Sequence, residues 1–184
     1  MKKIEKVAVL GAGTMGSGIA AQVANSGVAV RLLDMSREVA EQAKESLFSR
    51  KPAPLMSDAA GDLITTGGFD QDLASIADCD WIVEVIVERL GPKQELFEKV
   101  ESLRKPGSVV TSNTSGLLIS EITETLPESF RQDFLITHFF NPPRYMQLLE
   151  LVPGEQTGRE AYETISEFCS ASLGKVVVDA KDTP

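Results

Sequence analysis

A glycine-rich segment that directly follows a short apolar run constrains the fold of this chain more than any other feature. Residues 6–10 have the pattern of a buried strand, residues 11–16 read G-A-G-T-M-G, and residues 14–26 carry small and apolar side chains at helical spacing. In such a strand–turn–helix the first glycine permits the tight turn, the second lets a pyrophosphate approach the backbone, and the third lets the helix pack on the sheet. The segment predicts a dinucleotide site, and its candidate contacts are Gly11, Gly13, Thr14, Met15 and Gly16.

Apolar runs alternate with helical patterns along the rest of the chain. The expected strands are 29–33, 81–84, 108–111, 134–137, 148–152 and 175–178, and the expected helices are 37–50, 92–103, 117–126 and 158–173. Residues 51–68, which contain prolines and glycines, are expected to be loop. This alternation predicts an α/β fold, a Rossmann-type doubly wound and mostly parallel sheet with helices on both faces. Residues 1–184 are expected to form one domain.

The charge of the chain excludes several kinds of partner. There are 18 Lys and Arg against 27 Asp and Glu, for a net charge of −9. Such a chain does not attract nucleic acid or an anionic membrane through bulk charge, so a phosphate must be held by backbone N–H groups at a helix start. Two cysteines, Cys79 and Cys169, do not make a disulfide framework and predict small buried residues in a reducing compartment. We expect a cytoplasmic protein with no metal site.

Polar residues gather where the predicted strands end. Asp34, Glu84, Asn113 and His138 each lie at such an end, as does the glycine segment. Because parallel sheets bind ligands beyond the carboxyl ends of their strands, these residues predict one shared site. Asp34 can accept hydrogen bonds from both adenosine ribose hydroxyls and would repel a 2′-phosphate, which favours NAD over NADP. Arg37, which could soften that preference, is expected to be a helix-surface residue.

Two longer motifs resemble a known family. Residues 112–116 read S-N-T-S-G and residues 137–143 read T-H-F-F-N-P-P. With the glycine segment, they resemble the amino-terminal domain of L-3-hydroxyacyl-CoA dehydrogenase, an NAD-dependent enzyme of fatty-acid β-oxidation. V-E-V-I-V-E at 83–88, followed by Lys93, and K-D-T-P at 181–184 are also similar to that family. The resemblance covers nearly the whole chain.

The resemblance implies roles for individual residues. It places the catalytic histidine on His138, its paired glutamate on Glu150, and a serine that contacts substrate and nicotinamide on Ser115. It also implies cofactor contacts beyond the glycine segment, at Asp34, Glu88, Lys93, Asn113 and Asn141.

The chemistry of the residues is compatible with these roles. Oxidation of a secondary alcohol needs a base for the hydroxyl proton, and imidazole is suited to that task at neutral pH. A carboxylate on the other ring nitrogen would fix the tautomer, and pairing of the strands that carry His138 and Glu150 would bring the two together.

Other interpretations of the same residues stay open. His138, the only histidine, lies beside phenylalanines and could be a packed structural residue. Glu150 could simply face solvent. Ser115 is expected both to cap a helix from about residue 117 and to contact substrate. Glu88 and Lys93 could be an ordinary surface acid and a helix-face lysine.

The chain also departs from the family. A long helical hairpin that helps to grip CoA follows the second strand in single-function members, whereas 51–68 is short and looks more like the multifunctional forms that carry an enoyl-CoA hydratase module. The family continues past residue 184 into a helical domain that supplies a polar catalytic partner, closes the substrate cleft and forms a homodimer. We therefore expect an NAD-binding half that turns over 3-hydroxyacyl-CoA poorly by itself. The alternatives are a related dehydrogenase of a smaller hydroxy acid and a non-catalytic, redox-sensing NAD-binding module.

Overall fold

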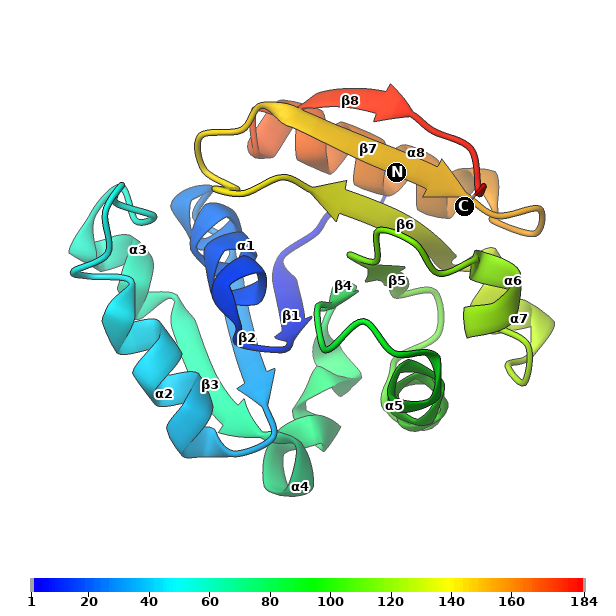
Figure 1. Cartoon of the computed structure of the whole chain (residues 1–184), viewed down its shortest axis with the longest axis horizontal. Helices are drawn as coiled ribbons and strands as arrows, with labels where there is room; N and C mark the ends of the chain where they lie inside the picture. Colours follow the sequence, from blue (N-terminus) through cyan, green and yellow to red (C-terminus); the bar gives the residue numbers. More distant parts are fainter. Residues whose placement is uncertain (1, 184) are drawn as a thin grey trace.

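An eight-stranded sheet forms the centre of the computed structural model, which describes residues 2–183 (Figure 1). The strand order is β3-β2-β1-β4-β5-β6-β7-β8. Strands β1 to β6 pair in parallel, β7 runs antiparallel to β6, and β8 is parallel to β7. The mostly parallel, Rossmann-type sheet predicted from the sequence is confirmed. The strands are β1 Lys6–Leu10, β2 Ala29–Asp34, β3 Ile64–Gly68, β4 Trp81–Glu84, β5 Val109–Ser112, β6 Phe134–Phe139, β7 Leu148–Pro153 and β8 Val176–Asp179.

Helices cover both faces of the sheet, as predicted. They are α1 Thr14–Asn25, α2 Arg37–Ser46, α3 Asp58–Asp62, α4 Phe69–Asp72, the 3₁₀ helix Leu73–Asp78, α5 Leu90–Leu103, α6 Ile119–Ile122, α7 Glu128–Gln132, α8 Arg159–Glu167 and the π-helical turn Phe168–Ser172. Successive strand residues point to opposite faces, so Val7 and Val9 of β1 join one apolar cluster and Ala8 and Leu10 join the other. Helices α1, α2 and α8 pack on the first cluster, and α5, α6 and α7 pack on the second.

The segment 51–68 differs from the expected loop. It contains α3 and the edge strand β3, so the loop prediction is wrong there. Of the glycines that suggested a loop, Gly61 is in α3, whereas Gly67 and Gly68 are in β3, where they permit close approach of neighbouring elements. A Cβ at Gly67 would lie 2.7 Å from Asp72 Cβ, and one at Gly68 would lie 3.0 Å from Arg37 N.

Helix ends also differ from the sequence pattern. Helix α2 begins at Arg37 as predicted, and the Ser36 hydroxyl caps it by accepting a hydrogen bond from Val39 N. The helix expected over 117–126 is reduced to α6, whose amide at Ile119 is capped by the Asp182 carboxylate. At its other end the Thr123 hydroxyl donates to Ile119 O, a side-chain contact with the backbone that competes with regular helix.

Both cysteines are free and buried. Burial raises the pKa of the Cys79 thiol to about 11, and it also raises the pKa of Cys169. The expectation of small buried residues is confirmed. Within residues 2–183, no helix has the length and apolar character that a membrane crossing requires.

Candidate functional site

The predicted site residues meet at one edge of the sheet. The glycine segment follows β1, Asp34 ends β2, Glu84 ends β4, and Asn113 follows β5. His138 lies near the end of β6. Because β2, β1, β4, β5 and β6 are neighbours and run in parallel, their carboxyl ends form a continuous edge. The shared edge inferred from the sequence is therefore observed.

The three glycines of the segment have different steric surroundings. Gly11 has a φ of 113°, and a Cβ there would lie 2.5 Å from Val85 O. A Cβ at Gly16 would lie 1.8 Å from Gly11 O, so the start of α1 can approach the turn only without a side chain. At Gly13, by contrast, a Cβ would meet no atom of residues 2–183 within 4 Å. A side chain at Gly13 would therefore enter open space.

The start of α1 can hold a phosphate. Gly13 is its N-cap residue, no side chain in the described part of the chain caps it, and its first turn carries no acid. The first N–H groups therefore keep their hydrogen-bonding capacity and the positive end of the helix dipole. Asp34 holds the adjoining turn, because its two carboxylate oxygens accept hydrogen bonds from Ala12 N and Met35 N at 2.5 and 2.6 Å. This cradle fits a dinucleotide.

Substitution of two of these glycines by alanine should separate folding from binding. Gly16→Ala should lower the free energy of unfolding by about 3 kcal/mol, because its Cβ overlaps Gly11 O. Gly13→Ala should leave stability within about 0.5 kcal/mol and weaken NADH binding by about tenfold or more, since the methyl group occupies the approach to the backbone. Urea unfolding and NADH fluorescence titration measure the two effects. Equal NADH affinity for Gly13→Ala and the unsubstituted chain would contradict a phosphate site at this turn.

The His138 side chain lies between those of Glu150 and Ser115. Antiparallel pairing of β6 with β7 places His138 directly opposite Glu150. His138 Nδ1 lies 2.8 Å from Glu150 Oε2, and Nε2 lies 3.1 Å from Ser115 Oγ. The His138 side chain is 22% exposed, so it is held by neighbours and still reaches solvent. The sequence left open whether these strands pair, and the structure shows that they do, so Glu150 is not simply a solvent-facing residue.

Glu84 and Lys93 form a buried ion pair beneath this site. Their side chains are 0% and 1% exposed, and Lys93 Nζ lies 2.6 Å from Glu84 Oε1. Ile86 N and Ser112 Oγ also donate to the Glu84 carboxylate, at 2.7 and 2.5 Å. Burial raises the pKa of Glu84, and these donors act against the increase. The interpretation of Lys93 as an ordinary helix-face lysine is wrong.

Glu88 lies between that ion pair and the loop after β5. Its carboxylate is 3.3 Å from Lys93 Nζ and accepts a hydrogen bond from Ser115 N at 3.0 Å. Partial burial opposes ionisation, but the Thr114 hydroxyl, the Ser115 amide and Lys93 hold the pKa of Glu88 below its usual value. Glu88 is therefore a carboxylate held by an ion pair and hydrogen bonds at the edge of the site.

The two asparagines are placed differently. Asn113 Oδ1 accepts a hydrogen bond from Phe139 N at 2.9 Å, which ties the loop after β5 to β6. Asn141 is exposed at the beginning of the connection from β6 to β7. Arg37, expected on the helix surface, is about half exposed and pairs with Asp72 at 2.9 Å.

Ser115 does not cap a helix, so that expectation is wrong. The residue before α6 is Leu118, and the amide of Ile119 is capped from a distant part of the chain by Asp182. The Thr114 hydroxyl, rather than that of Ser115, accepts a hydrogen bond from Leu117 N. The Ser115 hydroxyl is left to face His138.

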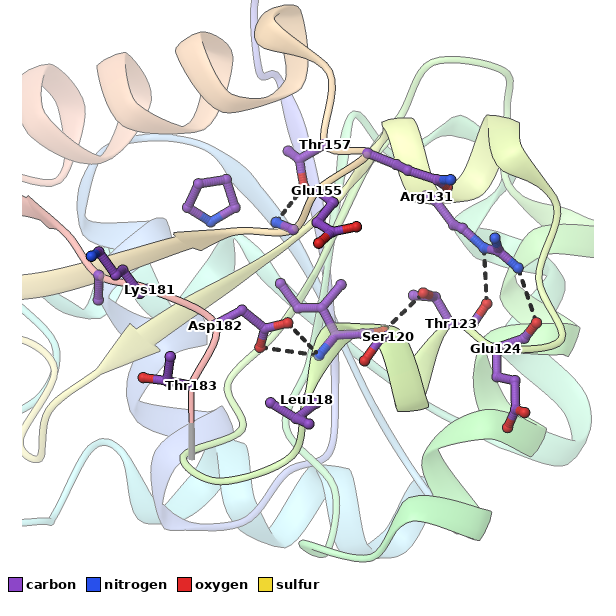
Figure 2. A pocket seen from close by; sticks show the side chains of 15 residues that line it. Leu118, Ser120, Thr123, Glu124, Arg131, Glu155, Thr157, Lys181, Asp182 and Thr183 are labelled. Atoms are coloured by element: carbon purple, nitrogen blue, oxygen red, sulfur yellow. Dashed lines mark hydrogen bonds between the residues drawn. The ribbon is translucent and has the colours of Figure 1, made fainter.

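Two hollows adjoin the His138 side of the site. Ser115, His138 and Glu150 line one of about 220 Å³, together with the segment 180–183. A larger one, of about 840 Å³, lies between α6, the loop after β7 and the same segment. Figure 2 shows the larger hollow, with dashed lines from the Asp182 carboxylate to the start of α6. Asp182 thus holds this segment beside the site, and Pro184 of the K-D-T-P motif lies outside the described residues.

The contacts of Glu84 and Asp182 were not predicted from the sequence. Glu84 ends a strand of apolar residues, and that was the signal that it is buried and paired. Asp182 was noted only within the K-D-T-P motif, and no local pattern linked it to a helix 63 residues away.

Comparisons with known proteins show the family to which the chain belongs. The sequence model of the family described as "3-hydroxyacyl-CoA dehydrogenase, NAD binding domain" matches residues 6–183. A Rickettsia felis protein named as a fatty acid oxidation complex trifunctional enzyme is 43% identical over 99% of this chain and 26% of its own length. A Deinococcus radiodurans protein named as a 3-hydroxyacyl-CoA dehydrogenase is 41% identical over 99% of this chain and 55% of its own.

A solved structure also matches. The 3-hydroxybutyryl-CoA dehydrogenase of Escherichia coli superimposes with a TM-score of 0.89 and 30% identity, over 100% of this chain and 39% of that one. This chain therefore spans about a quarter to a little over half of the length of these relatives. With the family model covering nearly every residue, the chain belongs to the NAD-binding domain family of the 3-hydroxyacyl-CoA dehydrogenases, which are NAD-dependent oxidoreductases.

Proposed function

We propose that this chain is the NAD-binding half of an enzyme that oxidises L-3-hydroxyacyl-CoA to 3-ketoacyl-CoA, with His138 as the general base. The observation that carries the proposal is the position of the imidazole, with Glu150 at 2.8 Å on one ring nitrogen and Ser115 at 3.1 Å on the other. A merely packed histidine would not need a carboxylate on one side and an open hydroxyl on the other.

The chemistry follows from this arrangement. Glu150 accepts a hydrogen bond from the protonated Nδ1 of His138. Nε2 is then unprotonated and able to take the proton of the substrate hydroxyl. When bound, NAD supplies the acceptor for the hydride that leaves the carbon bearing that hydroxyl. Glu150 then stabilises the imidazolium, as the carboxylate does in a serine–histidine–aspartate triad. The Ser115 hydroxyl, beside Nε2, can orient the substrate oxygen.

The cofactor contacts are proposed on the same basis. The phosphates would lie on Gly11, Gly13, Thr14, Met15 and Gly16, and the adenosine ribose on Asp34. Glu88, Lys93, Asn113 and Asn141 would complete the nicotinamide side. Glu88, Asn113 and Asn141 lie at the carboxyl edge of the sheet, whereas Lys93 is buried and would act through Glu88.

The substrate class and the setting are further parts of the proposal. The Rickettsia felis relative is named for fatty acid oxidation, which supports a role in β-oxidation within a longer, multifunctional enzyme. We propose a cytoplasmic protein that works with a helical domain, which would close the cleft over the His138 hollow and form a homodimer.

Dependence on such a domain gives the test of the proposal. The 184-residue chain should bind NADH, and its oxidation of 3-hydroxybutyryl-CoA should be about 10²-fold or more slower than that of a chimera with the carboxy-terminal part of the Deinococcus radiodurans relative, because the free chain orients substrate poorly. Absorbance of NADH at steady state measures both rates. Efficient turnover by the chain alone would refute the dependence, and an inactive but well-folded chimera would count against the dehydrogenase assignment.

Preference for NADH over NADPH is expected from Asp34. NADH should bind about tenfold or more tightly, because a carboxylate accepts from the ribose hydroxyls and repels a 2′-phosphate. Asp34→Asn should reduce the difference in affinity between NADH and NADPH while it keeps one acceptor for the Ala12 amide. Competitive fluorescence titrations give both affinities, and equal affinities in the unsubstituted chain would contradict the role of Asp34.

A further inference from the structure

Glu88 contacts consecutive residues of the loop that carries Ser115. Its Oε1 accepts hydrogen bonds from the Thr114 hydroxyl, from Ser115 N at 3.0 Å and from Gly116 N at 3.3 Å. These donors belong to one turn of backbone after β5. A single carboxylate oxygen therefore holds the main chain on both sides of Ser115.

The charge of Glu88 is itself held in place. Lys93 Nζ lies 3.3 Å from Glu88 Oε2 and 2.6 Å from the buried Glu84. Lys93 belongs to α5 and Glu84 ends β4, so both supports are regular structure. Charge-assisted hydrogen bonds are the strong ones, and an anchored carboxylate makes a well-defined acceptor. The lowered pKa of Glu88 agrees with an ionised side chain.

The Ser115 side chain has no comparable support of its own. The residue is exposed and lies in irregular backbone between β5 and α6. Its hydroxyl reaches His138 Nε2 at 3.1 Å. A small rotation of the 114–116 backbone would move that hydroxyl out of hydrogen-bond range.

We infer that Glu88 is a positioning residue, which fixes the backbone of residues 114–116 so that the Ser115 hydroxyl faces His138. A continuous line of polar contacts then runs from Glu84 through Lys93, Glu88, Ser115 and His138 to Glu150. This goes beyond a cofactor contact for Glu88. Its catalytic meaning rests on the proposed function, whereas the positioning itself can be measured without substrate.

The single histidine makes the test direct. His138 is the only histidine in the chain, so the ring-nitrogen signals in a ¹⁵N-histidine spectrum need no assignment. We expect Glu88→Ala to shift the Nε2 signal in the same direction as Ser115→Ala and by a comparable amount. In the double variant the shift should be no larger than in Ser115→Ala, because both changes remove one contact. In Glu88→Gln, which keeps an acceptor oxygen, the Nε2 signal should lie between its position in Glu88→Ala and its position in the unsubstituted chain.

Glu98→Ala is the matched control. Glu98 is also an exposed acid that accepts a hydrogen bond from a threonine hydroxyl, that of Thr125 at 3.0 Å, but within residues 2–183 no hydrogen bond or ion pair joins it to residues 114–116. It should leave the His138 signals unchanged. Glu88→Ala should remain folded, because Lys93 keeps its pair with Glu84.

Three outcomes would overturn the inference. The first is an unchanged His138 signal in Glu88→Ala when Ser115→Ala moves it. The second is an additional shift in the double variant, which would mean independent effects. The third is unfolding of both Glu88→Ala and Glu88→Gln, seen as collapsed amide dispersion, which would make the role one of stability. None of these depends on turnover, so failure of the proposed enzyme activity is scored separately by the chimera assay.

Discussion

Replacement of His138 by glutamine is expected to lower kcat of the active chimera by about 10²- to 10⁴-fold, the usual contribution of a positioned general base. Glutamine keeps a polar side chain of similar reach but cannot take up the hydroxyl proton. The NADH affinity of the 184-residue chain should change little, because His138 lies on β6, away from the glycine segment and Asp34. Steady-state kinetics of the chimera and NADH titration of the chain measure the two quantities separately.

Glu150→Gln is expected to have a smaller effect on kcat than His138→Gln. The amide keeps a hydrogen-bonding atom opposite Nδ1 at the position of the 2.8 Å contact, but it lacks the charge that stabilises an imidazolium. We expect its kcat to fall between that of the unsubstituted chimera and that of His138→Gln. An unchanged rate in His138→Gln would refute the assignment of His138 as the general base.

Removal of the Lys93 ammonium is expected to be the most destabilising of the changes considered. Lys93→Met should lower the free energy of unfolding by about 3–5 kcal/mol, the cost of leaving a buried charge without its partner. Glu84, at 0% exposure, would lose its cationic partner and, among residues 2–183, keep the Ser112 and Ile86 donors. Urea unfolding monitored by circular dichroism measures the loss. Glu84→Gln in the Lys93→Met background should recover part of it, since no unpaired charge is then buried.

The pH dependence of the Lys93→Met defect has a defined sign. Burial already raises the pKa of Glu84 in the folded chain, and loss of Lys93 removes the largest opposing influence. A carboxyl with a raised folded pKa binds protons more readily in the folded state than in the unfolded state, so acid stabilises the variant relative to neutral pH. Because the pKa of Glu84 is raised in both chains and more so in the variant, the difference in stability should grow as pH rises from the folded pKa of the unsubstituted chain to that of the variant, and shrink as pH falls through the same interval.

Lys99→Met is the control for this pair. Lys99 is an exposed lysine on the same helix, and its replacement should alter stability by no more than about 0.5 kcal/mol. Comparable losses in the two variants would mean that the Glu84–Lys93 pair contributes nothing specific. The same conclusion would follow if the Lys93→Met loss did not depend on pH.

Local pattern was enough for much of the fold. The run 6–10, the glycine turn and the helix from Thr14 were all predicted, because each follows from the steric demands of neighbouring residues. Trp81–Glu84 was predicted with its observed bounds, since a buried strand is a continuous apolar run. In 51–68 the local pattern misled, because the same glycines that permit a loop also permit an edge strand that packs closely on Arg37 and Asp72.

By itself, the sequence determined the dinucleotide turn, the parallel sheet and the set of polar residues at the strand ends. Those features depend on backbone geometry and periodicity, which neighbours in the chain specify. Only the tertiary structure decided that Glu150 lies opposite His138, that Lys93 is buried against Glu84, and that Glu88 holds the Ser115 loop. Each of these depends on strand register or on which elements pack together. The free energy that selects them comes from contacts between different strands, helices and loops, and no local pattern encodes it.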